Sequence, residues 1–351
     1  MLLVPLVAVF LAACSPKLTP PTHLCSRDQP FACRPVAAIE GMLVAPHLRI
    51  LDAQTAGEGK QGALLLTVEL EQHGKRERFQ VKWRAQSTAH GLNHPRKEVA
   101  AHALQKLLFE PEDYVFPPTR SRCFELLHYR RAVDPEARPT FAGVPCVFGT
   151  VSYWLSDAVS TEDAADEDWI QPDLLFDKDR FVSDPAYRRT LADLNLLTLV
   201  ASNGDTHSKQ FVFVETARGV RIYNVDFSIA FSDHRNATLG PEEAFSGLMV
   251  PALRRDSVDR LRRMTHAYAR LAAAERLIPV GDDLRHWKPQ LPPEDEAQAA
   301  SSTGLAWAPC SSEATCDKEL IVGLTQKELA IVRRQAHHLL SLVDNGAVTL
   351  F

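Results

Sequence analysis

The sequence predicts an α+β protein of two parts, an antiparallel sheet with one prominent helix followed by a mainly helical part. Residues 79–84 alternate strictly between apolar and polar side chains, which is typical of a strand with one polar face. Residues 184–201 instead carry leucines at helical spacing and end at Ser202-Asn203-Gly204, a helix-stop signal. The 351 residues, 45% hydrophobic and 24% charged, suffice for one two-lobed enzyme or two small domains.

The first part is expected to span residues 39–155. Its helix is predicted from Pro95 to Phe109 by an apolar stripe at helical spacing, formed by Val99, Ala103, Leu104, Leu107 and Leu108. A turn at His73-Gly74 joins two of the predicted strands into a hairpin. The strands are predicted over residues 43–51, 63–72, 77–84, 123–131 and 144–155.

The second part is expected to span residues 156–351. After the helix over 184–201, a short hairpin is predicted around Arg218-Gly219. The strands of this hairpin are predicted over 211–214 and 220–225. Helices are predicted near 252–275 and 326–344. Between these helices, the Pro-, Ala- and Ser-rich residues 289–312 are expected to form a surface loop.

The N-terminus indicates export. Residues 1–13 are apolar and too short for a stable membrane span, which suits the core of a signal peptide. They end in Leu11-Ala12-Ala13-Cys14, which resembles the bacterial lipobox, and Ser15 resembles a signal for outer-membrane sorting. We therefore expect a lipoprotein anchored through Cys14, with residues 14–38 as a tether. The alternative is that this segment is a buried strand or helix, since no Lys or Arg precedes it.

The remaining cysteines agree with an oxidising compartment. Six of them fall into three pairs that are close in sequence: Cys25 with Cys33, Cys123 with Cys146, and Cys310 with Cys316. Six cysteines allow 15 pairings, of which these local ones are the simplest. Disulfides persist outside the cytoplasm. Zinc is the alternative, but none of the pairs has the two-residue spacing of common zinc sites.

Composition also excludes some partners. The net charge of −5 provides no basic surface of the kind that binds nucleic acid. Beyond the N-terminus, no apolar run approaches the ~20 residues that a membrane-spanning helix needs. We therefore expect membrane contact only through the lipid anchor.

Four separated features suit the transfer of a phosphoryl group. A glycine-rich turn precedes the strand that carries Lys82, and the next helix carries Glu98. Asp205 follows the second long helix, and Asp226 ends the hairpin after it. In kinases, a glycine-rich loop covers the phosphates, a Lys held by a helix Glu contacts them, one Asp receives the acceptor proton and another binds the metal. Each residue alone has a plainer explanation, such as a solvated Lys or a tight turn.

In this order the residues resemble the atypical kinases that include HipA, the phosphoinositide kinases and the secreted Golgi casein kinases. The resemblance covers about residues 53–231, with 324–342 as a closing helix. It depends on the strings KEVAA at 97–101, VFPPT at 115–119, VSYW at 151–154, NGDTH at 203–207 and IYNVDF at 222–227. It implies a two-lobed kinase-like fold that binds ATP with Mg²⁺ or Mn²⁺.

The resemblance also implies the roles of individual residues. Lys82 would bind phosphate with Glu98 as its partner, Asp205 would be the catalytic base and Asp226 a metal ligand. His207 resembles a family His, Tyr153 lies in the strand and hinge that would hold adenine, and Gln210 stands where the family has a metal-binding Asn. The glycine backbone over the phosphates would come from Gly57, Gly59 and Gly62. Lys209 is a candidate for neutralising the transferred phosphate, with a solvated loop Lys as the alternative.

Three departures from the family pattern bear on catalysis. Gln210 places its amide oxygen about 1.5 Å further out than Asn would, in a site that needs near-octahedral geometry. Thr206 replaces an Arg, and Ser228 replaces a Gly after Phe227. The leading hypothesis is an ATP-dependent phosphotransferase acting on a hydroxyl of a protein, glycan or small molecule. The alternatives are a pseudokinase that binds nucleotide without transfer, and a surface lipoprotein of unrelated fold.

Overall fold

The computed structural model describes most of the chain between residues 23 and 351. The described residues are 23–24, 34–56, 62–72, 74–89, 91–155, 158–166, 176–216, 219–233, 247–264, 267–280, 283–286, 303–309 and 318–351. Cys14, Cys25, Cys33, Gly57 and Gly59 lie outside them, as do Cys310 and Cys316.

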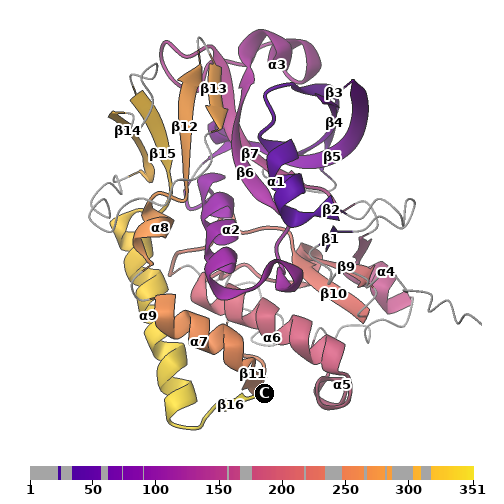
Figure 1. Ribbon diagram of the computed structural model, residues 1–351, viewed down its shortest axis with the longest axis vertical. Helices are drawn as coiled ribbons and strands as arrows, with labels where there is room; N and C mark the ends of the chain where they lie inside the picture. The colour runs from indigo at the N-terminus through magenta and orange to yellow at the C-terminus, as the bar shows by residue number, and fades with distance from the viewer. Residues whose placement is uncertain are drawn as a thin grey trace, which may run out of the picture.

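The first part is built on a five-stranded antiparallel sheet in the order β3-β4-β5-β7-β6 (Figure 1). The strands are β3 (Leu48–Thr55), β4 (Leu64–Gln72), β5 (Lys75–Ala85), β6 (Thr119–Glu125) and β7 (Cys146–Tyr153). Helices α1 (Val36–Leu43), α2 (Arg96–Leu108) and α3 (Leu126–Ala132) pack on it, with the short η1 (Gln86–Thr88) and η2 (Pro111–Asp113) in the connections. The mixed α+β composition and the antiparallel sheet agree with the sequence prediction.

The two faces of β5 explain its alternating sequence. Val81 and Trp83 are fully buried in a core that α1 and α3 complete through Ile39 and Tyr129. The intervening side chains of β5 lie on the opposite face, toward α2, which runs between the sheet and the helices of the second part (Figure 1). The polar face is therefore not open to water but covered by the rest of the molecule.

The second part centres on α6 (Pro185–Val200), whose Leu191, Leu194 and Leu197 are completely buried. Asp184 caps this helix by accepting hydrogen bonds from two backbone amides. Around α6 lie α4 (Thr161–Asp166), α5 (Lys178–Ser183), α7 (Arg255–Arg263), α8 (Ala269–Ala272) and α9 (Gln326–Asp344), with η3 (Ser208–Gln210), the sheet of β8 (Val159–Ser160), β9 (Phe211–Thr216) and β10 (Gly219–Asn224), and the parallel pair β11 (Ala252–Leu253) and β16 (Thr349–Leu350).

A second antiparallel sheet was not predicted. Its strands, in the order β13-β12-β15-β14, are β12 (Glu275–Val280), β13 (Asp283–His286), β14 (Leu305–Pro309) and β15 (Lys318–Val322). Leu277 of β12 and Leu320 and Val322 of β15 pack against Phe148 of β7, so these two strands are buried there by a tertiary contact. The prediction of a mainly helical second part was therefore incomplete, and β14 lies inside the predicted loop. Short apolar runs suit a buried strand or a buried helix equally well, which explains the omission.

Several predicted boundaries were also wrong. The strand expected over 123–131 ends at Glu125, whose carboxylate accepts hydrogen bonds from the amides of Leu127 and His128 and thereby starts α3. The strand expected over 43–51 is the end of α1 followed by β3. The helix expected over 252–275 is divided into α7 and α8, between β11 and β12. The predicted tether 14–38 overlaps β1 (His23–Leu24), β2 (Arg34–Pro35) and the start of α1.

A disulfide joins Cys123 of β6 to Cys146 of β7, as predicted. The two Cα atoms are 5.5 Å apart, a separation typical of disulfides, and both side chains are buried beside the second sheet. None of the helices in the described ranges has the length and apolar character required to cross a membrane.

Candidate functional site

A buried ion pair connects β5 to α2. Lys82 Nζ lies 2.7 Å from Glu98 Oε1, and the two residues are only 7% and 1% exposed. The alternation of β5 turns Lys82 toward α2, and Pro95 starts that helix so that Glu98 falls in its first turn. A buried pair of charges is costly unless it is well hydrogen-bonded, so Lys82 is not an ordinary solvated lysine.

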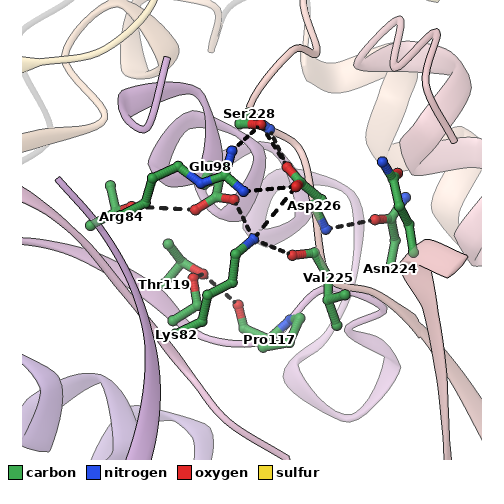
Figure 2. Close-up of polar contacts among 12 residues, drawn as sticks. Lys82, Arg84, Glu98, Pro117, Thr119, Asn224, Val225, Asp226 and Ser228 are labelled. Atoms are coloured by element: carbon green, nitrogen blue, oxygen red, sulfur yellow. Dashed lines mark hydrogen bonds and ion pairs between the residues drawn. The ribbon is translucent and has the colours of Figure 1, made fainter. Parts of the chain in front are cut away.

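Lys82 also reaches the second part of the molecule. Its Nζ donates to the backbone oxygen of Val225 at 2.6 Å and lies 3.9 Å from Asp226 Oδ2 (Figure 2). The structure thus brings together Lys82, Glu98 and Asp226, three residues that the sequence singled out. They come from the sheet, the first long helix and the segment after β10.

Arg84 completes this group, and sequence reasoning missed it. Its Nη2 donates to Asp226 Oδ2 at 2.8 Å, and its Nη1 donates to Ser228 Oγ at 2.6 Å (Figure 2). Nη1 also donates to Asn93 Oδ1 at 3.0 Å. Arg84 lies on the same face of β5 as Lys82, two residues further on, and this alternation was the available signal. We call Lys82, Arg84, Glu98 and Asp226 the cleft network.

The cleft network controls the charge of Asp226. Burial alone would raise the pKa of this carboxyl, but the positive charges of Lys82 and Arg84 and hydrogen bonds from Ser228 hold the pKa well below its usual range. Burial alone would lower the pKa of Arg84, but the charges of Asp226 and Glu98 raise it instead. Both side chains are therefore ionised at neutral pH.

The turn after α6 lies against the same segment. Asn203 is fully buried and its Nδ2 donates to the backbone oxygen of Asp226 at 2.9 Å. Asp205 is half-buried, and Gln210 Nε2 donates to its Oδ2 at 3.2 Å. Ser202 has φ +47°, so the chain leaves the helix through a left-handed residue two positions before Gly204, within the predicted stop signal Ser202-Asn203-Gly204.

His207 and Lys209 lie further along that turn, where it leads into β9. His207 is half-buried and Lys209 is exposed. Lys82 and Arg84 form the ion pairs with Asp226 described above.

A small cleft opens beside Lys82. It is lined by Tyr153, Trp154 and Leu155 at the end of β7 on one side and by Pro117, Val212 and Val225 on others. Its largely apolar lining suits contact with a planar ligand. Tyr153 thus lies where the sequence predicted a binding strand and hinge.

The glycine-rich turn is described only at its end. Gly62 has φ +69°, a conformation that favours glycine, and a Cβ there would lie 2.9 Å from Thr88 Cγ2. This backbone requirement explains Gly62 without any ligand. Gly57 and Gly59 lie outside the described residues, so their predicted contact with phosphates stays a prediction.

Helix α9 anchors α2, the helix that carries Glu98, through ion pairs. Arg96 donates to both carboxylate oxygens of Glu328 at 2.9 Å, and Lys97 Nζ lies 3.6 Å from the same carboxylate. Glu328 also forms a capping box with Thr325 at the start of α9. Glu98 is therefore presented by a helix that is anchored at both its first turn and its buried face.

The described residues do not fit the predicted Mg²⁺ or Mn²⁺ site. Asp226 Oδ1 accepts hydrogen bonds from the amide and hydroxyl of Ser228 at 2.9 and 2.7 Å, and Arg84 lies on Oδ2. Gln210 Oε1 and Asn203 Oδ1 are buried oxygens with no hydrogen-bond partner in this part of the chain. Amide oxygens can ligate Mg²⁺, but they add no negative charge beside Asp226 to balance a divalent cation. No group of three or more His, Cys, Asp or Glu side chains suitable for a metal occurs among the described residues.

Comparison with known proteins does not assign the chain to a family. No model of a protein family matches the sequence, and no curated protein shows significant similarity to it. The function proposed for the chain therefore depends on the residues of the site itself.

Proposed function

We propose that the protein is a nucleotide-binding protein with a kinase-like arrangement of two lobes, in which ATP lies between the five-stranded sheet and the α6 region. The observation that carries this proposal is the buried Lys82–Glu98 pair, whose ammonium also contacts Val225 and lies beside Asp226. A cation held in this way at the edge of an apolar cleft suits a ligand with a planar base and a charged phosphate chain.

We expect the base and the phosphates of the nucleotide to contact different residues of the cleft. The base would lie against Tyr153 and Leu155, and the phosphates would extend toward Lys82. Lys82 suits phosphate because it is a compact charge that Glu98 holds in one orientation. The anchoring of α2 by Glu328 supports this role, since a fixed Glu98 keeps Lys82 in place before any ligand arrives.

Binding is tested with the purified protein, its disulfides intact, in a thermal-shift titration with ATP. We expect ATP to raise the Tm of the wild type and, at the same concentration, to raise that of Lys82→Met much less. The matched control is Lys75→Met at the exposed start of the same strand, which should respond like the wild type. A wild type that ATP stabilises neither alone nor together with Mn²⁺ contradicts the proposal.

Phosphoryl transfer to a hydroxyl is the second candidate function. Asp205 favours it, because a half-buried carboxylate oriented by Gln210 can accept the proton of an acceptor hydroxyl. The acceptor would be a protein, a glycan or a small molecule. Incubation with γ-labelled ATP tests it, and transfer should fall by about 10³-fold or more in Asp205→Ala. Asp259→Ala, on the exposed side of α7, is the control. Label transfer that persists in Asp205→Ala rules out this role.

We further propose that the protein is exported and anchored to the outer membrane through lipid on Cys14. The disulfide between Cys123 and Cys146 supports an oxidising compartment. Expressed in a bacterium, the wild type should sediment with membranes and incorporate labelled fatty acid, whereas Cys14→Ser should do neither. Incorporation of label by Cys14→Ser would refute the anchor.

A further inference from the structure

We infer that Arg84 takes the place of a divalent cation at Asp226, so that this site binds nucleotide without Mg²⁺ or Mn²⁺. The part of this inference that concerns nucleotide rests on the proposed function. The part that concerns the metal does not, because it follows from the contacts of Asp226 alone. It explains why the described residues do not fit the metal site that the sequence predicts.

Both oxygens of the Asp226 carboxylate already have hydrogen-bond donors. Oδ1 is bound by the amide and the hydroxyl of Ser228, and Oδ2 by Arg84 at 2.8 Å, with Lys82 at 3.9 Å. A divalent cation would have to displace the guanidinium, because two cations cannot share one oxygen at contact distance without strong repulsion. Arg84 thus acts as the counter-ion of Asp226.

The side chain of Arg84 is fixed by burial and by its hydrogen bonds. It is only 3% exposed, and Asn93 and Ser228 hold its Nη1 while Nη2 reaches Asp226. Ser228 contacts both Arg84 and Asp226, so the hydroxyl that replaces the glycine of the kinase-like pattern is part of this arrangement. An arginine cannot lose its proton at neutral pH, so its charge is permanent.

The charges of the cleft network agree with a metal-free site. Lys82 and Arg84 carry two positive charges, and Glu98 and Asp226 carry two negative ones. Adding a divalent cation would leave an excess of positive charge in a mostly buried group, which is costly in a region of low dielectric constant. Lys82, at the edge of the cleft, remains the cation nearest to an incoming phosphate.

The metal part is tested on the nucleotide-free protein by titrating Mn²⁺ and following the signal of free Mn²⁺ by electron paramagnetic resonance. We expect the wild type to leave Mn²⁺ free up to about 1 mM. Arg84→Met should gain a binding site, which the double variant Arg84→Met/Asp226→Asn should lose. Arg84→Lys, which keeps the charge, and Arg78→Met, an exposed position on the same strand, should behave like the wild type.

The nucleotide part is tested by measuring ATP affinity in the presence of EDTA and again with Mn²⁺. Wild-type affinities should agree within about twofold, and Arg84→Met should bind ATP better with Mn²⁺ than with EDTA. Mn²⁺ bound by the wild type through Asp226, or no gain of Mn²⁺ binding in a folded Arg84→Met, overturns the inference. If Arg84→Met does not fold, the wild-type titrations still test whether the protein binds Mn²⁺ and whether ATP binding requires it.

The two proposals fail in different ways. A wild type that binds ATP only with Mn²⁺ overturns the metal-free site but leaves nucleotide binding intact. A wild type that binds no ATP under either condition contradicts the proposed function, whereas the Mn²⁺ titration of Arg84→Met still decides the role of Arg84.

Discussion

Two charged networks share helix α2, and they differ in what surrounds them. The cleft network includes Glu98, and one turn later His102 belongs to a second group, the Glu40 network of Glu40, His102, Lys106 and Arg120. In that group Glu40 accepts hydrogen bonds from His102 at 2.7 Å and Lys106 at 2.8 and 2.9 Å, with Arg120 at 3.4 Å. Both networks combine a lysine, an arginine and a carboxylate on or beside the same helix.

The difference lies in the cleft. Lys82 lines a cleft and reaches across to Val225, whereas the Glu40 network joins α1, α2 and β6. Burial and charge do not by themselves identify a functional site. The cleft network becomes a candidate because one of its cations lines a cleft with a largely apolar wall.

The largest effect that separates the networks should come from Glu40→Ala. The change leaves His102, Lys106 and Arg120 without their shared carboxylate, and we expect a loss of about 3 kcal/mol in the free energy of unfolding. Urea unfolding followed by circular dichroism measures it, with the exposed Glu136→Ala as control. The folded variant should bind ATP like the wild type. If the folded Glu40→Ala variant binds ATP more weakly than the wild type, the Glu40 network also contributes to binding, and the two networks do not differ in function.

The next largest effect compares two lysines that each pair with a glutamate. Lys82→Met should weaken ATP binding by about 100-fold, close to 2.7 kcal/mol, because it removes the cation at the cleft. Lys106→Met removes the lysine of the Glu40 network, whose side chain is 37% exposed, and should change affinity by less than about twofold. Isothermal titration calorimetry measures both. Equal losses would mean that neither lysine contacts the ligand.

Gln105 joins His102 of the Glu40 network to the backbone of Val115 and Phe116, so its replacement tests a buried part of that network. Its Oε1 accepts from the amides of Val115 and Phe116, and its Nε2 donates to Phe116 O and to His102 Nδ1. Gln105→Leu should lower the unfolding free energy by about 2 kcal/mol, since it leaves buried backbone groups unpaired. Chemical denaturation tests this against the exposed Gln72→Leu. A neutral effect would show that the segment is held by other contacts.

The smallest effect concerns pH and the Glu40 network alone. Burial lowers the pKa of His102, which outweighs the charge of Glu40, and Nδ1 must stay unprotonated to accept from Gln105. The unfolded chain, with an ordinary His pKa near 6.5, then binds more protons, so the stability from His102 is present above pH 6.5 and lost as pH falls.

We expect the Tm to drop between pH 7.5 and pH 5.5, and the drop to be a few degrees smaller in His102→Gln. Scanning calorimetry at the two pH values measures it. The control is His338→Gln, at an exposed position of α9, which should keep the wild-type response. A response that is unchanged in His102→Gln would mean that other groups govern the acid sensitivity.

The sequence by itself determined the local elements and the candidates for the site. The alternation around Lys82 predicted β5, the leucine spacing before Asn203 predicted α6, and α9 was predicted from Gln326 to Asp344, the limits that it has. These features are readable because period, caps and turns depend on residues a few positions apart. The order of Lys82, Glu98 and Asp226 was readable for the same reason.

Only the tertiary structure decided which charges meet. Arg84 and Asp226 are 142 residues apart, and Arg96 and Glu328 are 232 apart, so no local pattern reports either pair. The strands β12 and β15 were likewise missed because their apolar residues are buried only by packing against Phe148, which lies far away in the sequence. Long-range ion pairs depend on how α6, the hairpin and α9 pack against the sheet. That packing turned the predicted metal ligand Asp226 into the partner of an arginine.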